Sequence, residues 1–219
     1  MKQIVVSLLF ILLFTACDKY KYPQDKKISD KGGAIIDTLG GHLPKEFVYD
    51  GKTQNLAWNS NLIMQINSYY LETKEPVLFN YYLDRDVFRL LLHEEGKEPL
   101  ILSLNKEERR AWIVSKRISI ESPEVTDQQE LDSIADLPLL WVNFDVKSRE
   151  LNKQQVQTFD SLFQTINFFD LPVGEVDKKY DNYCVFEAHQ KNKYWYVYRS
   201  SDDTSLADIS EYIRSLSGY

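Results

Sequence analysis

Residues 183–218 read YCVFEAHQKNKYWYVYRSSDDTSLADISEYIRSLSG, and this stretch decides the fold class. Segments 183–189 and 194–199 are rich in aromatic and β-branched residues, and the polar residues 190–193 lie between them. This pattern predicts a β-hairpin. The residues that follow carry apolar side chains at a spacing of three or four positions, which predicts a helix directly after the hairpin.

We expect two amphipathic helices in the C-terminal half of the chain. In the last one the apolar residues are Leu206, Ile209, Ile213 and Leu216. Thr204 or Ser205 is suited to cap its start, and Gly218 is suited to end it. The earlier helix follows a capping residue, Ser148, and ends before Pro172 and Gly174. Its apolar face comprises Leu151, Val156, Phe159, Leu162, Phe163 and Ile166.

Upstream of these elements, short apolar segments alternate with polar turns, as in an antiparallel meander. The expected strands are residues 77–82, 87–93, 100–104 and 111–120, followed after a gap by 139–146. Gly96 supplies the permissive backbone for one of the turns. Residues 56–70 precede the meander with helical spacing, and the acidic residues 121–136 are expected to form a surface loop.

This order of elements predicts the α+β class, with an antiparallel β-sheet built from the meander and the C-terminal hairpin, and two or three helices packed on it. Hydrophobic residues make up 43% of the chain, which is enough for a substantial core. We expect residues 34–219 to form a single domain.

The N-terminal residues predict export and lipidation. Lys2 precedes an apolar run over residues 4–14 that is shorter than the roughly 20 residues needed to cross a bilayer. Residues 1–16 therefore have the layout of a signal peptide. Residues 13–17, LFTAC, resemble the lipobox of bacterial lipoproteins, and this resemblance implies a diacylglyceryl group on Cys17. An ordinary cleaved signal peptide is the alternative.

If Cys17 is acylated, residues 17–33 comprise this lipidated cysteine and a flexible tether. The protein would then lie in the cell envelope, bound to a bacterial membrane through its lipid, with the outer membrane favoured. The net charge is −7, and removal of residues 1–16 changes the balance to 25 − 33 = −8. Such an acidic chain is unsuited to bind nucleic acid, so we expect a protein or glycan partner in the envelope, and no cofactor.

Several segments resemble a group of uncharacterised exported proteins and lipoproteins of Bacteroidota. The resemblance extends over residues 75–218, apart from residues 121–136. The matching positions are Phe88-Arg89, Asn167-Phe168-Phe169, Leu171-Pro172, Trp195 to Tyr198 and Arg199-Ser200. That group has no established activity, so the resemblance implies no catalytic residues.

The candidate binding residues lie at the end of the C-terminal hairpin. Arg199 and Ser200 precede a helix start, which is a place suited to an anion, although a structural ion pair of Arg199 is the alternative. Tyr194, Tyr196 and Tyr198 share one face of their strand, and Trp195 and Val197 share the other. One row is expected to be core, and the other, if exposed, would be a binding surface.

Other polar residues are expected to be structural. Cys184 and His189 are five positions apart on one strand and so point to opposite faces, which argues against a thiol–imidazole pair and makes Cys184 a buried hydrophobe. His93 has no second histidine at metal-binding spacing, so we predict no metal site. Asp202 and Asp203 are expected to cap the final helix.

The leading functional hypothesis is a membrane-anchored envelope lipoprotein with a non-enzymatic binding or structural role. One alternative is an immunity lipoprotein that neutralises a basic toxin. The other is a hydrolase of envelope polymers, for which paired carboxylates would be needed; the candidates are Asp84, Asp86, Glu94 and Glu95.

Overall fold

The computed structural model describes residues 41–44, 46–49, 52–55, 61–79, 83, 85–121, 141–174, 180–190 and 193–219. The predicted signal peptide, Cys17 and the tether lie outside these residues, as does Asp84. Within the described part of the chain, no helix has the length and apolar character needed to span a membrane.

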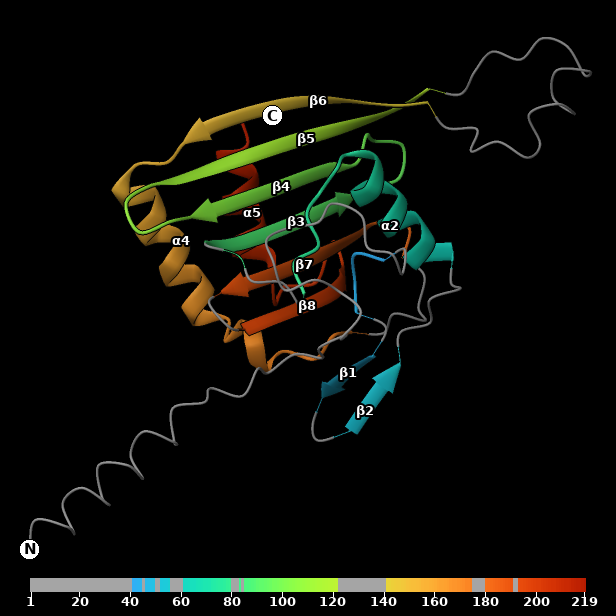
Figure 1. Cartoon of the computed structure of the whole chain (residues 1–219), viewed down its shortest axis with the longest axis horizontal. Helices are drawn as coiled ribbons and strands as arrows, with labels where there is room; N and C mark the ends of the chain where they lie inside the picture. Colours follow the sequence, from blue (N-terminus) through green and yellow to red (C-terminus); the bar gives the residue numbers. More distant parts are fainter. Residues whose placement is uncertain are drawn as a thin grey trace, which may run out of the picture.

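A six-stranded antiparallel sheet forms the centre of the molecule, with strand order β6-β5-β4-β3-β7-β8 (Figure 1). Its strands are β3 (Asp86–His93), β4 (Leu100–Lys106), β5 (Ala111–Glu121), β6 (Trp141–Glu150), β7 (Tyr183–Gln190) and β8 (Lys193–Ser200). A separate hairpin joins β1 (Glu46–Tyr49) to β2 (Lys52–Asn55). Three α-helices are described: α2 (Asn61–Glu72), α4 (Lys153–Thr165) and α5 (Ala207–Leu216), with a 3₁₀ turn, η1 (Phe168–Asp170), after α4. The predicted α+β class and antiparallel sheet are confirmed.

One face of the sheet, here called the helix face, packs against α4 and α5. Phe88 of β3 lies with its ring centroid 4.7 Å from that of Phe159 and 4.8 Å from that of Phe163, both on α4. Tyr212 of α5 donates to the carbonyl oxygen of Gln155 at 2.8 Å and so joins the two helices. In Figure 1, α5 lies behind the sheet and α2 in front of it.

The opposite face, here called the strap face, is covered only in part. Helix α2 and residues 73–79, which we call the strap, lie over β7, β3, β4 and the adjoining part of β5. His189 Nδ1 lies 2.7 Å from the carbonyl oxygen of Leu78, and Lys116 Nζ donates to the carbonyl oxygen of Thr73 at 2.6 Å. Among the described residues the coverage ends at β5, and none of them lies over the outer part of β5 and β6 on this face.

The structure corrects the expected strand 77–82. In the described part of that range, Val77, Leu78 and Phe79 are buried but lie in the irregular strap rather than in a strand. The Leu78 carbonyl oxygen lies 2.7 Å from His189 Nδ1, so a side chain of the sheet takes the place of a strand partner there. The predicted helix 56–70 is described from Asn61 and continues to Glu72.

Two predicted helix caps are also wrong. Strand β6 continues to Glu150, and Ser148 pairs with Val114 of β5 instead of starting a helix. Asn152 is the N-cap of α4, where its side chain accepts the Gln155 backbone N–H at 2.9 Å. At α5 the N-cap position is Leu206, without a side-chain cap.

The glycine predictions agree with the structure. Gly96 in the β3–β4 turn has φ +73°, and Gly218 after α5 has φ +75°, both in the left-handed region that favours glycine.

Candidate functional site

The aromatic strand β8 does not present a binding surface. Tyr194, Tyr196 and Tyr198 are each about 1% exposed on the strap face, while Trp195 and Val197 are buried on the helix face. Both rows are core because each face of the sheet is covered at this strand. Burial raises the pKa of Tyr198 to about 12. One row was predicted to be core, and the structure shows that both are, so the second row does not meet the condition for a binding surface.

Arg199 forms hydrogen bonds with the segment of chain that follows α4. Its guanidinium donates to the carbonyl oxygens of Pro172, Val173 and Tyr198 at 2.6–2.9 Å. Its Nε lies 3.6 Å from Asp203 Oδ2. Gly174 fits closely beside it, since a Cβ there would lie 2.1 Å from the Tyr198 carbonyl oxygen. These contacts favour the structural alternative for Arg199. The neighbouring Ser200 hydroxyl donates to Asp202.

Cys184 and His189 lie on opposite faces of β7, as the spacing predicts. Cys184 is 4% exposed, and burial raises the pKa of its thiol to about 12. A thiol in this state is a poor nucleophile at neutral pH. The prediction that Cys184 is a buried hydrophobe is confirmed.

Among the described carboxylates considered for hydrolysis, Asp86 lies far from Glu94 and Glu95. Asp86 begins β3, whereas Glu94 follows its end, so the rise of the strand separates them by about 26 Å. This is far beyond the roughly 5–10 Å of a glycosidase acid pair. In the described ranges, no group of three or more histidine, cysteine or acidic residues could hold a metal ion.

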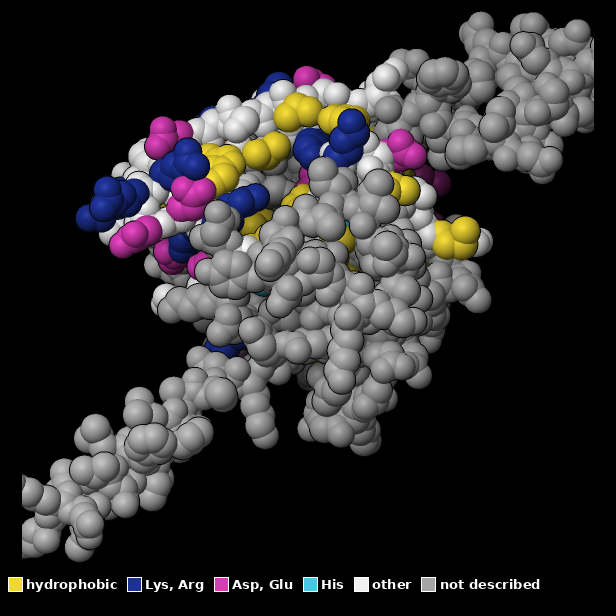
Figure 2. Space-filling model, viewed as in Figure 1, with side chains coloured by type: hydrophobic (Ala, Val, Ile, Leu, Met, Phe, Trp, Pro, Cys, Tyr) yellow, Lys and Arg dark blue, Asp and Glu magenta, His cyan; other side chains and the backbone are white. Residues whose placement is uncertain are grey.

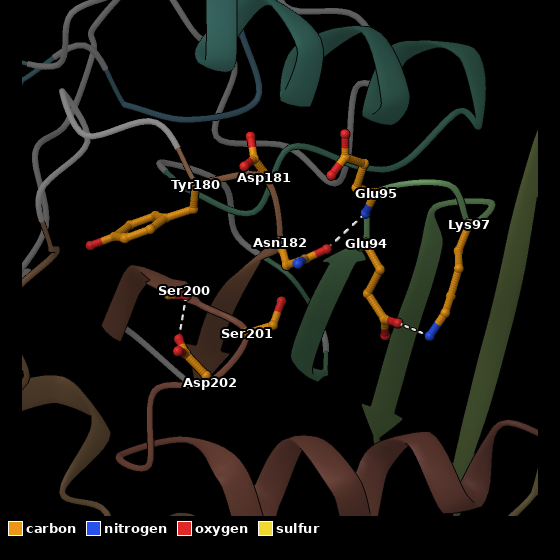
Figure 3. A pocket seen from close by; sticks show the side chains of 9 residues that line it. All are labelled: Glu94, Glu95, Lys97, Tyr180, Asp181, Asn182, Ser200, Ser201 and Asp202. Atoms are coloured by element: carbon orange, nitrogen blue, oxygen red, sulfur yellow. Dashed lines mark hydrogen bonds and ion pairs between the residues drawn. The ribbon is translucent and has the colours of Figure 1, made fainter.

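A polar hollow of about 670 Å³ lies where the β3–β4 turn meets the ends of β7 and β8 (Figure 3). Its lining residues are Glu94, Glu95, Lys97, Tyr180, Asp181, Asn182, Ser200, Ser201 and Asp202. Glu94 is paired with Lys97 and with Arg214, and the hydrogen bond from Lys97 contributes most to lowering the Glu94 pKa. Asn182 accepts the backbone N–H of Glu95 at 2.7 Å. Four acids face one lysine, so the hollow is acidic.

A buried ionic network lies beneath the strap. Arg89 forms a two-pronged contact with Glu187, in which Nε and Nη2 donate to the two carboxylate oxygens at 2.8 and 2.9 Å. Glu75 of the strap lies 3.5 Å from Arg89 Nη1 and 2.7 Å from Lys116 Nζ. The side chains of Arg89 and Glu187 are 0% exposed. The network therefore contains two cations and two anions in balance.

Neutral groups complete this network. Tyr194 donates to Glu187 Oε1 at 2.8 Å, and the ring of Tyr70 lies 4.0 Å from the Arg89 guanidinium carbon. Burial by itself disfavours the charged guanidinium, but the carboxylate of Glu187 together with Tyr70, Glu75 and Tyr194 more than offsets this and raises the Arg89 pKa. Because the central ion pair is closed to solvent, we interpret the network as the element that fixes the strap to the sheet. Sequence reasoning missed it, although Arg89 and Glu187 are single charges within apolar strands.

In the part of the chain that the structure describes, neither the strap nor a helix covers the strap face over the outer part of β5 and β6. Four apolar side chains, here called the open strip, lie there: Trp112, Val114, Phe144 and Val146. Val146 is 48% exposed, one of the three most exposed large hydrophobic residues among those described. Figure 2 shows hydrophobic and basic side chains together on this part of the surface. The guanidinium carbons of Arg110 and Arg85 lie 4.9 and 5.9 Å from the Trp112 ring centroid.

The open strip combines aromatic and aliphatic side chains with neighbouring arginines. Aromatic and arginine side chains are enriched at protein interfaces. The strip contains no described nucleophile or acid pair. It is thus the described surface best suited to contact another macromolecule.

Comparison of the chain with protein-family models, with curated proteins and with solved structures gave no match. The resemblance to exported proteins of Bacteroidota therefore stays a prediction.

Proposed function

We propose that this protein is a lipid-anchored envelope protein with a non-enzymatic binding role. The lipobox-like residues ending at Cys17 support the anchor, and the polar residues up to position 33 support a tether. Anchoring in the outer membrane is the favoured location. The folded domain would then be presented to partners at the membrane surface.

The open strip carries the binding proposal. On the sheet, Val146 is exposed and Phe144 is half-buried. Binding of a partner that removes such apolar surface from water is favourable. The arginines beside Trp112 add a charged rim that would favour carboxylates on the partner. A protein surface that combines apolar and acidic groups fits this strip.

Replacement of Cys17 tests the anchor. We expect the wild-type chain in the membrane fraction of the native bacterium, and the Cys17→Ser variant outside it, because the variant has no sulfur for the acyl group. A Cys184→Ser variant is the control and should fractionate like the wild type, since that thiol is buried. Retention of the Cys17→Ser variant on the membrane would contradict lipid anchoring.

Site-specific photo-crosslinking in cells tests the strip. A photoreactive residue in place of Val146 or Trp112 should give a defined adduct with an envelope component. The control position is Met64, which is 58% exposed on α2 but lies outside the strip. If positions 146 and 112 give no adduct, or only the same adducts as position 64, the binding proposal is wrong.

The acidic hollow favours a narrower candidate function, capture of a basic toxin by an immunity lipoprotein. Glu95, Asp181 and Asp202 line it together with the paired Glu94. Opposite charge accelerates association and selects the partner. A strain that lacks the gene should become more sensitive to a toxin of competing bacteria, and a Glu95→Lys/Asp181→Lys gene should not restore resistance. Unchanged sensitivity on deletion would remove this candidate.

A further inference from the structure

Strand β6 is the outer edge of the sheet, and its far side is open to another strand. It spans Trp141–Glu150 and pairs on one side with β5. Among the described residues no backbone group pairs with its other side. An edge of this length with free N–H and C=O groups is a template for a further strand.

The charges of β6 complement a second copy of the same strand. In an antiparallel pair, the side chains of facing residues lie on the same side of the sheet. Because both strands would be copies of β6, whose side chains alternate between the two faces, an even-numbered residue must face an even-numbered one and an odd-numbered residue an odd-numbered one. Under a two-fold axis, the two residue numbers in every facing pair therefore add to the same even total. Two such alignments retain the longest overlap. In the first alignment, residues 141–149 of one copy run antiparallel to residues 141–149 of the other, and Asp145 faces Asp145. The second pairs 142–150 with itself and places Asp145 opposite Lys147 twice, by symmetry.

The second alignment also places Val146 opposite Val146. This residue is 48% exposed, and the pairing would remove part of its apolar surface from water. Asp145 and Lys147 lie on the helix face, where the Tyr219 hydroxyl donates to Asp145 Oδ2 at 2.8 Å and Lys147 Nζ lies 3.7 Å from the Tyr219 ring centroid. Both side chains remain exposed there.

We propose that β6 pairs with β6 of a second copy in this alignment and joins two sheets into one across a two-fold axis at Val146. The open strips of the two copies then meet on the strap face and form one larger apolar surface. This inference rests on the edge and its charges, and it holds whether or not the chain is acylated. It extends the proposed function, because the dimer would present two copies of the open strip to a binding partner.

Disulfide trapping in the full-length protein tests the alignment. Cα atoms of facing residues in an antiparallel pair are about 4.5–5.5 Å apart, which a disulfide can bridge. A Val146→Cys variant should therefore form a disulfide-linked dimer under mild oxidation. Ser148→Cys is the matched control on the same strand, because its copy would lie four residues away along the strand, at roughly 13 Å.

Met64→Cys is a second control on an exposed position of α2, and the wild type gives the background from Cys17 and Cys184. Trapping at position 146 alone supports the proposal. Equal trapping at 146 and 148, or none above background, would overturn it.

Charge reversal gives an independent readout. Lys147→Asp places like charges at both symmetric positions and should weaken dimerisation by about tenfold in sedimentation. The double variant Asp145→Lys/Lys147→Asp restores opposite charges and should restore the dimer, with thermal unfolding as the check on folding. Failure of the double variant to recover would overturn the alignment. If dimerisation fails while positions 146 and 112 still crosslink to a foreign component, the binding proposal survives and this inference does not.

Discussion

Removal of the Arg89 side chain should destabilise the fold severely. In an Arg89→Leu variant, Glu187 loses both donors of its two-pronged contact and Glu75 loses one of its two cations. Breaking a buried ion pair from one side costs about 3–5 kcal/mol, because the remaining charge is buried without compensation. Domains are stable by about 5–15 kcal/mol in total, so this loss is a large fraction.

The double variant Arg89→Leu/Glu187→Leu separates this effect from simple loss of packing. It removes one cation and one anion, and it leaves Glu75 paired with Lys116 at 2.7 Å. Replacing both partners of a buried pair with apolar groups is often neutral or stabilising. We therefore expect the double variant to unfold at a higher urea concentration than the single variant.

Equilibrium urea unfolding, followed by circular dichroism, measures both free energies of unfolding. The control is Arg110→Leu, which removes an exposed arginine and should leave the free energy of unfolding nearly unchanged. A loss below about 1 kcal/mol for Arg89→Leu, or a double variant less stable than the single one, would refute the assigned role of the network.

The remaining predictions concern single residues. Burial, followed in importance by the charge of Arg89, lowers the pKa of His42 to about 4. In the unfolded chain this histidine binds its proton near pH 6.5. The free energy of unfolding should therefore fall by about 3 kcal/mol as the pH falls from about 6.5 to about 4. This component should be missing in His42→Gln, and identical pH profiles of the two proteins would contradict it. Cys184, whose thiol pKa is raised to about 12 by burial, should react with a thiol reagent at pH 8 only in denaturant; fast labelling of the native Cys17→Ser variant would disagree. Gly174→Ala should lower the melting temperature far more than Gly218→Ala, because both positions have positive φ but only at Gly174 would a Cβ meet other atoms, and equal losses would show that crowding is unimportant.

Local sequence patterns were sufficient to predict most of the secondary structure. The alternation of apolar residues located β3, β4, β5, β7 and β8, and the helical spacing located α4 and α5. The end of β6 was misplaced because Ser148 is a good helix cap in isolation, and only its pairing with Val114 of β5 keeps it in the strand. The apolar residues Val77 to Phe79 were mistaken for a strand because burial in an irregular strap produces the same composition.

The sites depended on contacts that no local pattern contains. Arg89 and Glu187 are 98 positions apart, and their pairing requires β7 to lie beside β3 rather than at the end of the meander. Because β7 and β8 extend the sheet beyond β3 and lie beneath the strap, both faces of β8 are buried. On the described part of the sheet, the exposed large hydrophobic residue is Val146 of β6, and nothing in its local sequence indicated a binding surface there.

Intact-mass analysis of the protein from its native membrane tests the central claim most directly. The account predicts a chain that begins at Cys17 and carries the added mass of a diacylglyceryl group. A chain that retains residues 1–16, or one that begins near Cys17 with a free thiol there, would contradict a lipid-anchored envelope protein.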